Sequence, residues 1–215
     1  MPNQNELFSQ SVLAPLPLAD AELLFCPRVA LGQDEDAPLQ QLIEQTPWSQ
    51  ESVRMYGKRY LQPRLTAWYG EPEARYRYSG KTYEPLPFTP LLLRLQQVVA
   101  QASGSDYNSV LLNYYRDGAD SMGLHADDEP ELGPRPCIAS LSLGETREIY
   151  FRHKRRRDLG TFKLALPSSS LLVMRGDTQA NWKHGIRKLS QSCGPRLNLT
   201  FRWVNTAGLR PESPR

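Results

Sequence analysis

Three residues of this sequence are of types that bind a catalytic metal ion. His125 and Asp127 are two positions apart, so both side chains project from one face of an extended segment. His184 lies much later in the chain. Two imidazoles and one carboxylate are the ligand set of mononuclear non-haem Fe(II) oxygenases, which leaves further coordination positions open. The alternative for the first two is a turn in which Asp127 and Asp128 cap the segment that follows.

A second group of side chains indicates a site for a dicarboxylate. Residues 196–203 have the period-two pattern of a strand, and one face is apolar: Leu197, Leu199, Phe201 and Trp203. The other face carries hydrogen-bond donors and no acid: Arg196, Asn198, Thr200 and Arg202. Guanidinium groups pair with carboxylates through two hydrogen bonds, so such a row suits a bound dicarboxylate. Taken alone, this segment favours the alternative, an ordinary amphipathic strand whose polar face lies in solvent.

The two groups together predict a single site. A 2-oxo acid that chelates the metal would present its far carboxylate to the donor row, which begins at Arg196, shortly after His184. We therefore expect the strands that carry these groups to be neighbours.

The elements that must position these side chains are mostly short strands. Candidates bounded by Gly, Pro and Asp are residues 109–115, 137–143, 147–152, 161–166, 170–174 and 196–204. Two helices precede them, one over 36–46 and one that follows the N-cap Thr89 and stops at Gly104. Residues 53–83 alternate basic and aromatic side chains and predict short strands and hairpins. Strands without intervening helices are typical of a sandwich, jelly roll or small barrel.

The composition excludes several classes of protein. The chain has 215 residues, a net charge of +3 and 40% hydrophobic residues, which indicates a globular protein rather than a disordered one. No apolar run is long enough to span a membrane, and no secretion signal is visible. The cysteines, Cys26, Cys137 and Cys193, are too far apart for a disulfide framework or a thiolate zinc site. We expect a cytoplasmic protein, or a nuclear one in a eukaryote, with no membrane partner.

Residues 109–204 resemble the catalytic core of the AlkB family of Fe(II)- and 2-oxoglutarate-dependent nucleic-acid dealkylases. The matching segments are NYY at 113–115, HADDE at 125–129, IASLSLG at 138–144, FRHK at 151–154, the segment around His184 and RLNLTFR at 196–202. Upstream, the segments MYGKRY, PR at 63–64 and RYRYSG at 75–80 resemble the nucleotide-recognition lid of the subgroup that prefers duplex DNA.

The resemblance implies a mainly β (α+β) fold. The catalytic core over residues 109–204 would be a double-stranded β-helix, or jelly roll. We expect a loose N-terminal arm at 1–20, then helices and a β-hairpin nucleotide-recognition lid at 21–108. A C-terminal tail at 205–215 would complete a single domain.

The resemblance also implies which residues form the site. Three would bind Fe(II): His125, Asp127 and His184. Six would surround the cosubstrate 2-oxoglutarate: Asn113, Tyr115, Arg196, Asn198, Thr200 and Arg202. Among these, Arg196 would pair with the distal carboxylate, and Arg202 would brace the metal end and act in catalysis. Without the family, Asn113 and Tyr115 could be a strand-edge amide and a core aromatic.

Aromatic side chains of the lid are candidates to hold a flipped base, because a base inside a duplex cannot reach a buried metal. Tyr56 would be a wedge between base steps or, alternatively, a tyrosine at a hairpin tip. Tyr76 and Tyr78 share a strand face and would line the pocket, with Tyr78 stacked on the base. Their alternative is a place in the hydrophobic core.

Charged residues are candidates for further contacts with nucleic acid. Asp128 and Glu129 would favour a cationic methylated base or, alternatively, form a solvated acidic turn. A basic run would bind phosphates or be a solvated face: Arg152, Lys154, Arg155, Arg156 and Arg157. His153 is interpreted as part of this basic surface, and Arg64 would reach the opposite DNA strand.

The implied function is repair of DNA by oxidative demethylation. An Fe(II)- and 2-oxoglutarate-dependent dioxygenase would use O₂ to remove methyl groups from bases of the 1-methyladenine and 3-methylcytosine type, releasing formaldehyde. We expect a monomer that acts on single-stranded or duplex DNA. The alternatives are the same enzyme acting on RNA or tRNA, or a non-catalytic jelly-roll module that binds nucleic acid. A protein or small-molecule hydroxylase would have no need of the basic and aromatic lid.

Overall fold

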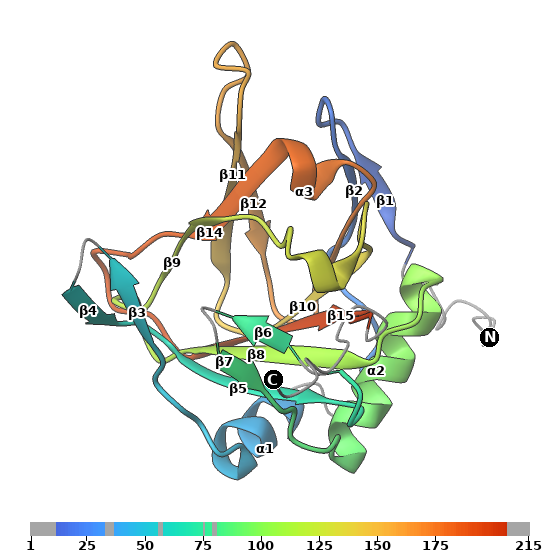
Figure 1. The fold of residues 1–215 in the computed structure, drawn as a ribbon, viewed down its shortest axis with the longest axis vertical. Helices are drawn as coiled ribbons and strands as arrows, with labels where there is room; N and C mark the ends of the chain where they lie inside the picture. Colours follow the sequence, from blue (N-terminus) through green and yellow to red (C-terminus); the bar gives the residue numbers. More distant parts are fainter. Residues whose placement is uncertain (1–11, 33–36, 56–57, 75, 79–80, 206–215) are drawn as a thin grey trace, which may run out of the picture.

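A computed structural model describes residues 12–32, 37–55, 58–74, 76–78 and 81–205. Within them, two antiparallel sheets face each other (Figure 1). The seven-stranded sheet has the order β1-β2-β13-β10-β15-β8-β5. Its strands are Ala14–Leu16, Glu22–Cys26, Leu171–Arg175, Ile138–Gly144, Arg196–Arg202, Ser109–Tyr115 and Leu65–Gly70. The four-stranded sheet has the order β12-β11-β14-β9, formed by Phe162–Leu166, Arg147–His153, Trp182–Ile186 and Met122–His125. This is the mainly β jelly roll that we predicted.

Two helices cover the outer face of the seven-stranded sheet (Figure 1). They are α1, Ala37–Gln45, and α2, Pro90–Ser103. Helix α2 begins as its sequence predicts, because the Thr89 side chain accepts a hydrogen bond from the Leu92 amide at 3.2 Å. It ends at Gly104, which has the left-handed conformation that a residue with Cβ rarely adopts.

The alternation of β15 decides which of its side chains face the site. Leu197, Leu199 and Phe201 are buried in the core beneath the helices. The donor face therefore points the other way, into the space between the sheets. Trp203 departs from the predicted pattern and is 48% exposed, because the strand ends at Arg202.

Two hairpins lie outside the main sheets, as predicted for residues 53–83. Strands β3, Ser52–Met55, and β4, Lys58–Leu61, form one of them. Strands β6, Tyr76–Tyr78, and β7, Lys81–Tyr83, form the other. The remaining short elements are the helix α3, Thr178–Asn181, and a 3₁₀ turn over Pro130–Leu132.

The structure differs from the sequence prediction near the N-terminus and at the metal-bearing strands. Residues Ala14–Leu16 form β1 and pair with β2, where we expected a loose arm up to residue 20. The six predicted strands are present: residues 109–115 match without a shift, and the other five have ends shifted by one or two residues. Strands β9 and β14 are not among the strands that the sequence predicts. All three cysteines are free, as expected. None of the helices in the described part of the chain is long and apolar enough to cross a membrane.

Candidate metal and cosubstrate site

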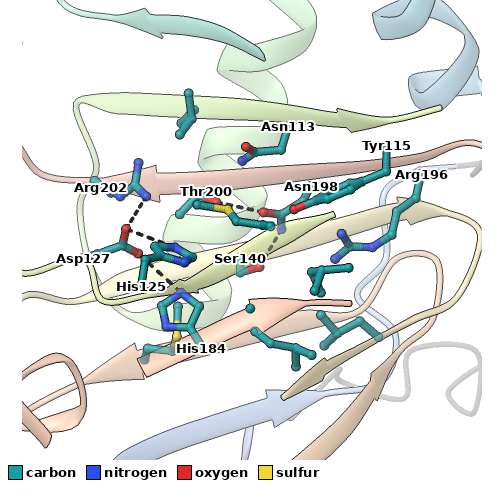
Figure 2. Close-up of a pocket in the computed structure, with 17 residues that line it drawn as sticks. Asn113, Tyr115, His125, Asp127, Ser140, His184, Arg196, Asn198, Thr200 and Arg202 are labelled. Carbon is teal, nitrogen blue, oxygen red and sulfur yellow. Dashed lines mark hydrogen bonds and ion pairs between the residues drawn. The ribbon is translucent and has the colours of Figure 1, made fainter. Parts of the chain in front are cut away.

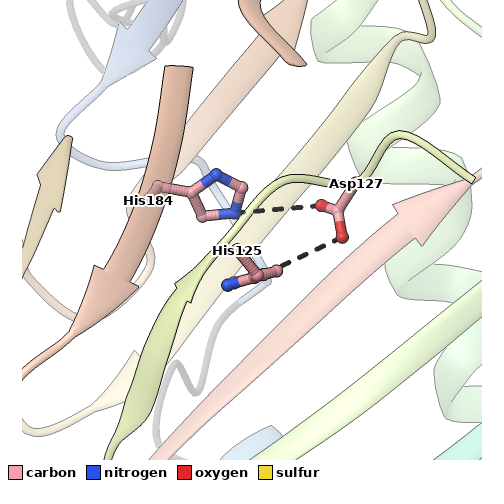
Figure 3. Close-up of side chains that lie close together, drawn as sticks. All are labelled: His125, Asp127 and His184. Atoms are coloured by element: carbon pink, nitrogen blue, oxygen red, sulfur yellow. Dashed lines mark ion pairs between the residues drawn. The ribbon is translucent and has the colours of Figure 1, made fainter. Parts of the chain in front are cut away.

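The three predicted metal ligands meet between the sheets (Figure 3). Strand β9 pairs with β14 so that His125 lies opposite His184, and their rings are 4.3 Å apart. Asp127 follows two residues after His125, and the Nε2 atom of each histidine lies 3.9 Å from one of its oxygens. The potential ligand atoms all lie within 4.8 Å of one another. The predicted cluster is therefore present.

The charge states of the buried ligands suit a divalent cation. Burial opposes ionisation of Asp127, but Arg202, together with the neighbouring His125 and His184, outweighs this effect and lowers the pKa of Asp127 to about 2. Burial, helped by the neighbouring His125, lowers the pKa of His184 to about 3. A carboxylate and a neutral imidazole, which metal binding requires, are thus the stable forms at neutral pH.

An unsatisfied oxygen shows where a cation would bind. The Nη2 atom of Arg202 donates to Oδ1 of Asp127 at 2.7 Å, whereas Oδ2 is buried without a hydrogen-bond partner. The Nδ1 atom of His125 lies 3.0 Å from the Gly123 carbonyl, a hydrogen bond that leaves Nε2 available. Burying an anionic oxygen without a hydrogen-bond partner destabilises the fold unless a bound cation balances its charge. These residues therefore fit the Fe(II) that the ligand types predict.

Arg196 lies at the opposite end of the same pocket from the metal ligands (Figure 2). Its side chain is 1% exposed, and its Nη2 atom donates to the Ser142 hydroxyl at 2.9 Å. Its Nε and Nη1 atoms have no hydrogen-bond partner. Burial lowers the pKa of Arg196 to about 10, so it stays protonated at neutral pH. A buried guanidinium with two free donors fits the distal carboxylate of 2-oxoglutarate.

The other residues predicted to surround the cosubstrate line this pocket as well. Asn198 donates to the Ser140 hydroxyl at 2.6 Å and accepts from Thr200 at 2.9 Å. The guanidinium of Arg196 lies over the Tyr115 ring, with its Cζ atom 5.2 Å from the centre of the ring. Asn113 is buried on β8. The predicted donor face is therefore a pocket wall, and the solvent-facing interpretation of β15 is wrong.

Arg64 occupies a place that the sequence did not indicate. It is buried, and its Nε atom donates to Oδ1 of Asn113 at 2.7 Å. This hydrogen bond gives Arg64 a contact within the protein, and its contact with the opposite DNA strand remains a prediction. The hydrogen bond fixes the Asn113 amide, with its oxygen toward Arg64.

The residues predicted to contact nucleic acid differ in their exposure to solvent. Asp128 is exposed and pairs with Lys154 at 2.9 Å, Glu129 is half-buried, and Arg152 is exposed. Tyr56 lies outside the described residues, as do the side chains of Tyr76 and Tyr78. These contacts with nucleic acid remain predictions.

His153 does not belong to the basic surface where we placed it. Its side chain is 4% exposed and packs edge-on against Trp182. Its Nδ1 atom accepts hydrogen bonds from the amides of Arg155 and Arg156, at 3.1 and 2.8 Å. His153 therefore fixes the backbone of the loop that carries Arg155 and Arg156.

Sequence reasoning missed two buried polar residues near the site. Arg147 donates to the carbonyls of Asp117, Asp120 and Arg187 and lies 5.7 Å from the centre of the Tyr115 ring. Gln179 accepts the backbone N–H of Asp127 at 3.0 Å. Both act on backbone groups, which leave no pattern of side-chain types in a sequence.

Comparisons with known proteins agree with this geometry. The family model of the 2OG-Fe(II) oxygenase superfamily matches residues 23–202. Alpha-ketoglutarate-dependent dioxygenase alkB homolog 3 of Bos taurus is 41% identical over 196 residues, covering 87% of this chain and 68% of that protein. DNA oxidative demethylase ALKBH2 of Mus musculus is 39% identical over 172 residues, covering 77% of this chain and 72% of that protein.

A solved structure supports the fold independently of close sequence similarity. The structure of OsALKBH1 matches with a TM-score of 0.61 at 16% identity, covering 88% of this chain and 100% of that one. A match at this level of identity concerns the fold alone. The site rests on the residues described above.

Proposed function

Because this chain belongs to the 2OG-Fe(II) oxygenase superfamily, and within it to the AlkB family, we propose that it repairs N-alkylated bases in DNA by oxidative demethylation. The proposal rests on one observation: a single pocket has polar groups without hydrogen-bond partners at both of its ends. At one end Asp127 presents an unpaired oxygen beside two histidines, and at the other Arg196 presents two unpaired donors. A metal ion and a dicarboxylate would satisfy both.

The protein would hold Fe(II) through His125, Asp127 and His184, and 2-oxoglutarate through Arg196 and its neighbours. With O₂, the bound iron and 2-oxoglutarate would supply the oxidation of an N-methyl group to a hydroxymethyl group, with succinate and CO₂ as coproducts. The hydroxymethyl group would then leave as formaldehyde, with release of its hydroxyl proton, and the cationic base nitrogen would regain its neutral lone pair. Burial of Asp127, His184 and Arg196 limits the access of water to these groups.

The roles of individual side chains follow from their contacts. Arg202 keeps Asp127 ionised and occupies one carboxylate oxygen, so the other oxygen is the one offered to the metal. Arg196 would orient the cosubstrate through its charge and its free donors, which are available to the distal carboxylate. Asn113, held by Arg64, has its amide nitrogen free to donate to the same ligand.

DNA is the proposed substrate because a relative named DNA oxidative demethylase is 39% identical to this chain over 172 residues. We propose that the exposed Arg152 contacts phosphates and that Asp128 and Glu129 favour a cationic methylated base. The side chains of the two hairpins would hold the flipped base. We further propose a monomer that works in the cytoplasm, or in the nucleus of a eukaryote.

Four matched oligonucleotides test the proposal. Each carries one 1-methyladenine and is offered as single-stranded DNA, duplex DNA, single-stranded RNA or duplex RNA, with Fe(II), ascorbate and 2-oxoglutarate. Mass spectrometry should show loss of the methyl group from DNA only when 2-oxoglutarate is present. Faster loss from RNA would make the protein an RNA dealkylase, and no loss with no succinate would favour the non-catalytic binding module.

A further inference from the structure

The backbone of the metal ligand Asp127 is held by a buried side chain from another element. Gln179, in α3, is 1% exposed, and its Oε1 atom accepts the Asp127 N–H at 3.0 Å. Its Nε2 atom faces the sulfur of Met174, which lines the pocket, at 3.5 Å. Since the Asp127 amide is buried, Gln179 satisfies a donor that would otherwise lose its hydrogen bond on folding.

Lys154 also connects helix α3 to the loop that carries Asp127. Its Nζ atom donates to the Gln179 carbonyl at 2.7 Å and to Oδ2 of Asp128 at 2.9 Å. Its own backbone N–H donates to the Asn181 carbonyl at 2.7 Å. Lys154, directly after β11, thus joins the short helix α3 to the residue that follows the metal ligand.

These contacts give Lys154 a different role from that of its basic neighbours. Two of its three ammonium protons are used within the protein, so a phosphate contact would compete with both bonds. The pair with Asp128 is partly exposed and contributes little by itself. The bond to Gln179 matters more, because it holds the helix whose side chain fixes Asp127.

We propose that Gln179 and Lys154 are positioning residues for the metal ligand Asp127, and that Lys154 acts here rather than as a phosphate contact. Gln179 acts directly on the Asp127 amide, and Lys154 acts through Gln179 and Asp128. Loss of either would let the loop move and would misplace the carboxylate relative to His125 and His184. This inference rests on the proposed metal site, because it assigns the support of one of that site's ligands.

The test is a Co²⁺ titration without nucleic acid, followed by the visible absorption of the bound metal. Gln179→Met keeps the size of the side chain but removes the acceptor, and it should weaken Co²⁺ affinity by about 10–100-fold. Lys154→Met should weaken it less, and Lys154→Arg should restore most of it because a guanidinium can donate to both partners. Circular dichroism and thermal melting check that each variant is folded.

Lys163→Met is the matched control. Lys163 lies on the neighbouring strand β12 and pairs only at the surface with Glu148, at 3.1 Å. Its replacement should leave Co²⁺ affinity unchanged. The variants are also titrated with a fluorescent DNA oligonucleotide after saturation with Co²⁺. If Lys154 acts as proposed, Lys154→Met lowers DNA affinity no more than Lys163→Met does.

The possible results separate this inference from the proposed function. Unchanged Co²⁺ affinity in Gln179→Met overturns the positioning role of Gln179. Unchanged Co²⁺ affinity in Lys154→Met, with weakened DNA binding, makes Lys154 a phosphate contact and overturns its positioning role. If the wild-type protein binds no Co²⁺ at all, the proposed metal site and function fail together with the inference.

Discussion

Arg202 donates from Nη2 to Oδ1 of Asp127 at 2.7 Å, which joins the last strand of the cosubstrate wall to the metal-binding loop. The contact leaves Oδ2 of Asp127 without a partner on the side of His184, 3.9 Å from its Nε2 atom. One carboxylate oxygen is thus committed to the protein and the other is left for a ligand. The same pair connects the two halves of the site, since Arg202 belongs to the strand that begins at Arg196.

Removal of Arg202 should change the pH dependence of metal binding. Its positive charge lowers the pKa of Asp127, so Arg202→Met should raise that pKa and leave more of the carboxyl protonated in mild acid. As the pH falls, Co²⁺ binding should be lost at a higher pH in Arg202→Met than in the wild type. Arg187→Met is the control, because Arg187 is exposed and stacks on Tyr150 outside the pocket. Superimposable pH profiles of Arg202→Met and wild type would contradict this role.

Replacement of Arg196 should weaken the binding of 2-oxoglutarate. A buried carboxylate that loses its arginine partner costs about 2 kcal/mol or more, which is about 30-fold in Kd. Arg196→Met should show at least this loss when 2-oxoglutarate is titrated into Mn²⁺-loaded protein by calorimetry. Arg196→Lys should recover only part of the affinity, because an ammonium group cannot reproduce the planar, fixed donors of a guanidinium. An unaltered Kd in Arg196→Met would remove Arg196 from the cosubstrate site.

Arg64 and Asn113 should behave as one unit toward 2-oxoglutarate. Their 2.7 Å hydrogen bond orients the amide, so Arg64→Met and Asn113→Leu should each raise the Kd of 2-oxoglutarate. The double variant should be little worse than the worse single variant, because both remove the same contact. Additive losses would show that the two residues act independently. A defect of Arg64→Met confined to duplex DNA would instead support the predicted contact of Arg64 with the opposite strand.

Arg147 should matter for stability because it is a buried cation bonded to three carbonyls. Its replacement leaves those groups without their partner, and we expect Arg147→Met to lower the free energy of unfolding by about 3 kcal/mol or more. The comparison is Arg135→Ala, which breaks exposed ion pairs with Glu22 and Asp177 and should cost about 1 kcal/mol or less. Urea unfolding followed by fluorescence measures both. Equal losses would contradict the difference that burial predicts.

The sequence was sufficient to predict the parts of the site that depend on local spacing. His125 and Asp127 share a face because they are two positions apart, and the donor face of β15 follows from strict alternation. His184 could be assigned because few histidines are present to choose from. The start of α2 was predictable because Thr89 and Pro90 form a local N-terminal signal.

The remaining parts depend on contacts between segments far apart in the chain. Arg64 reaches Asn113 only because β5 and β8 are neighbours in the sheet, and in the sequence alone it was one arginine in a basic stretch. Lys154 was read as one cation in a basic run, whereas the fold gives it two acceptors within the protein. His153 was placed on the surface because its neighbours are charged, but Trp182 covers it.

The most direct test of the account measures two products of the same reaction. Wild-type protein with Fe(II), 2-oxoglutarate and a DNA oligonucleotide carrying 1-methyladenine should form formaldehyde and succinate in nearly equal amounts, and Asp127→Ala should form neither. Omission of the methyl group from the oligonucleotide should abolish formaldehyde. Succinate formation that never yields formaldehyde from methylated DNA would contradict the proposed demethylase. Full activity in Asp127→Ala would contradict the metal site itself.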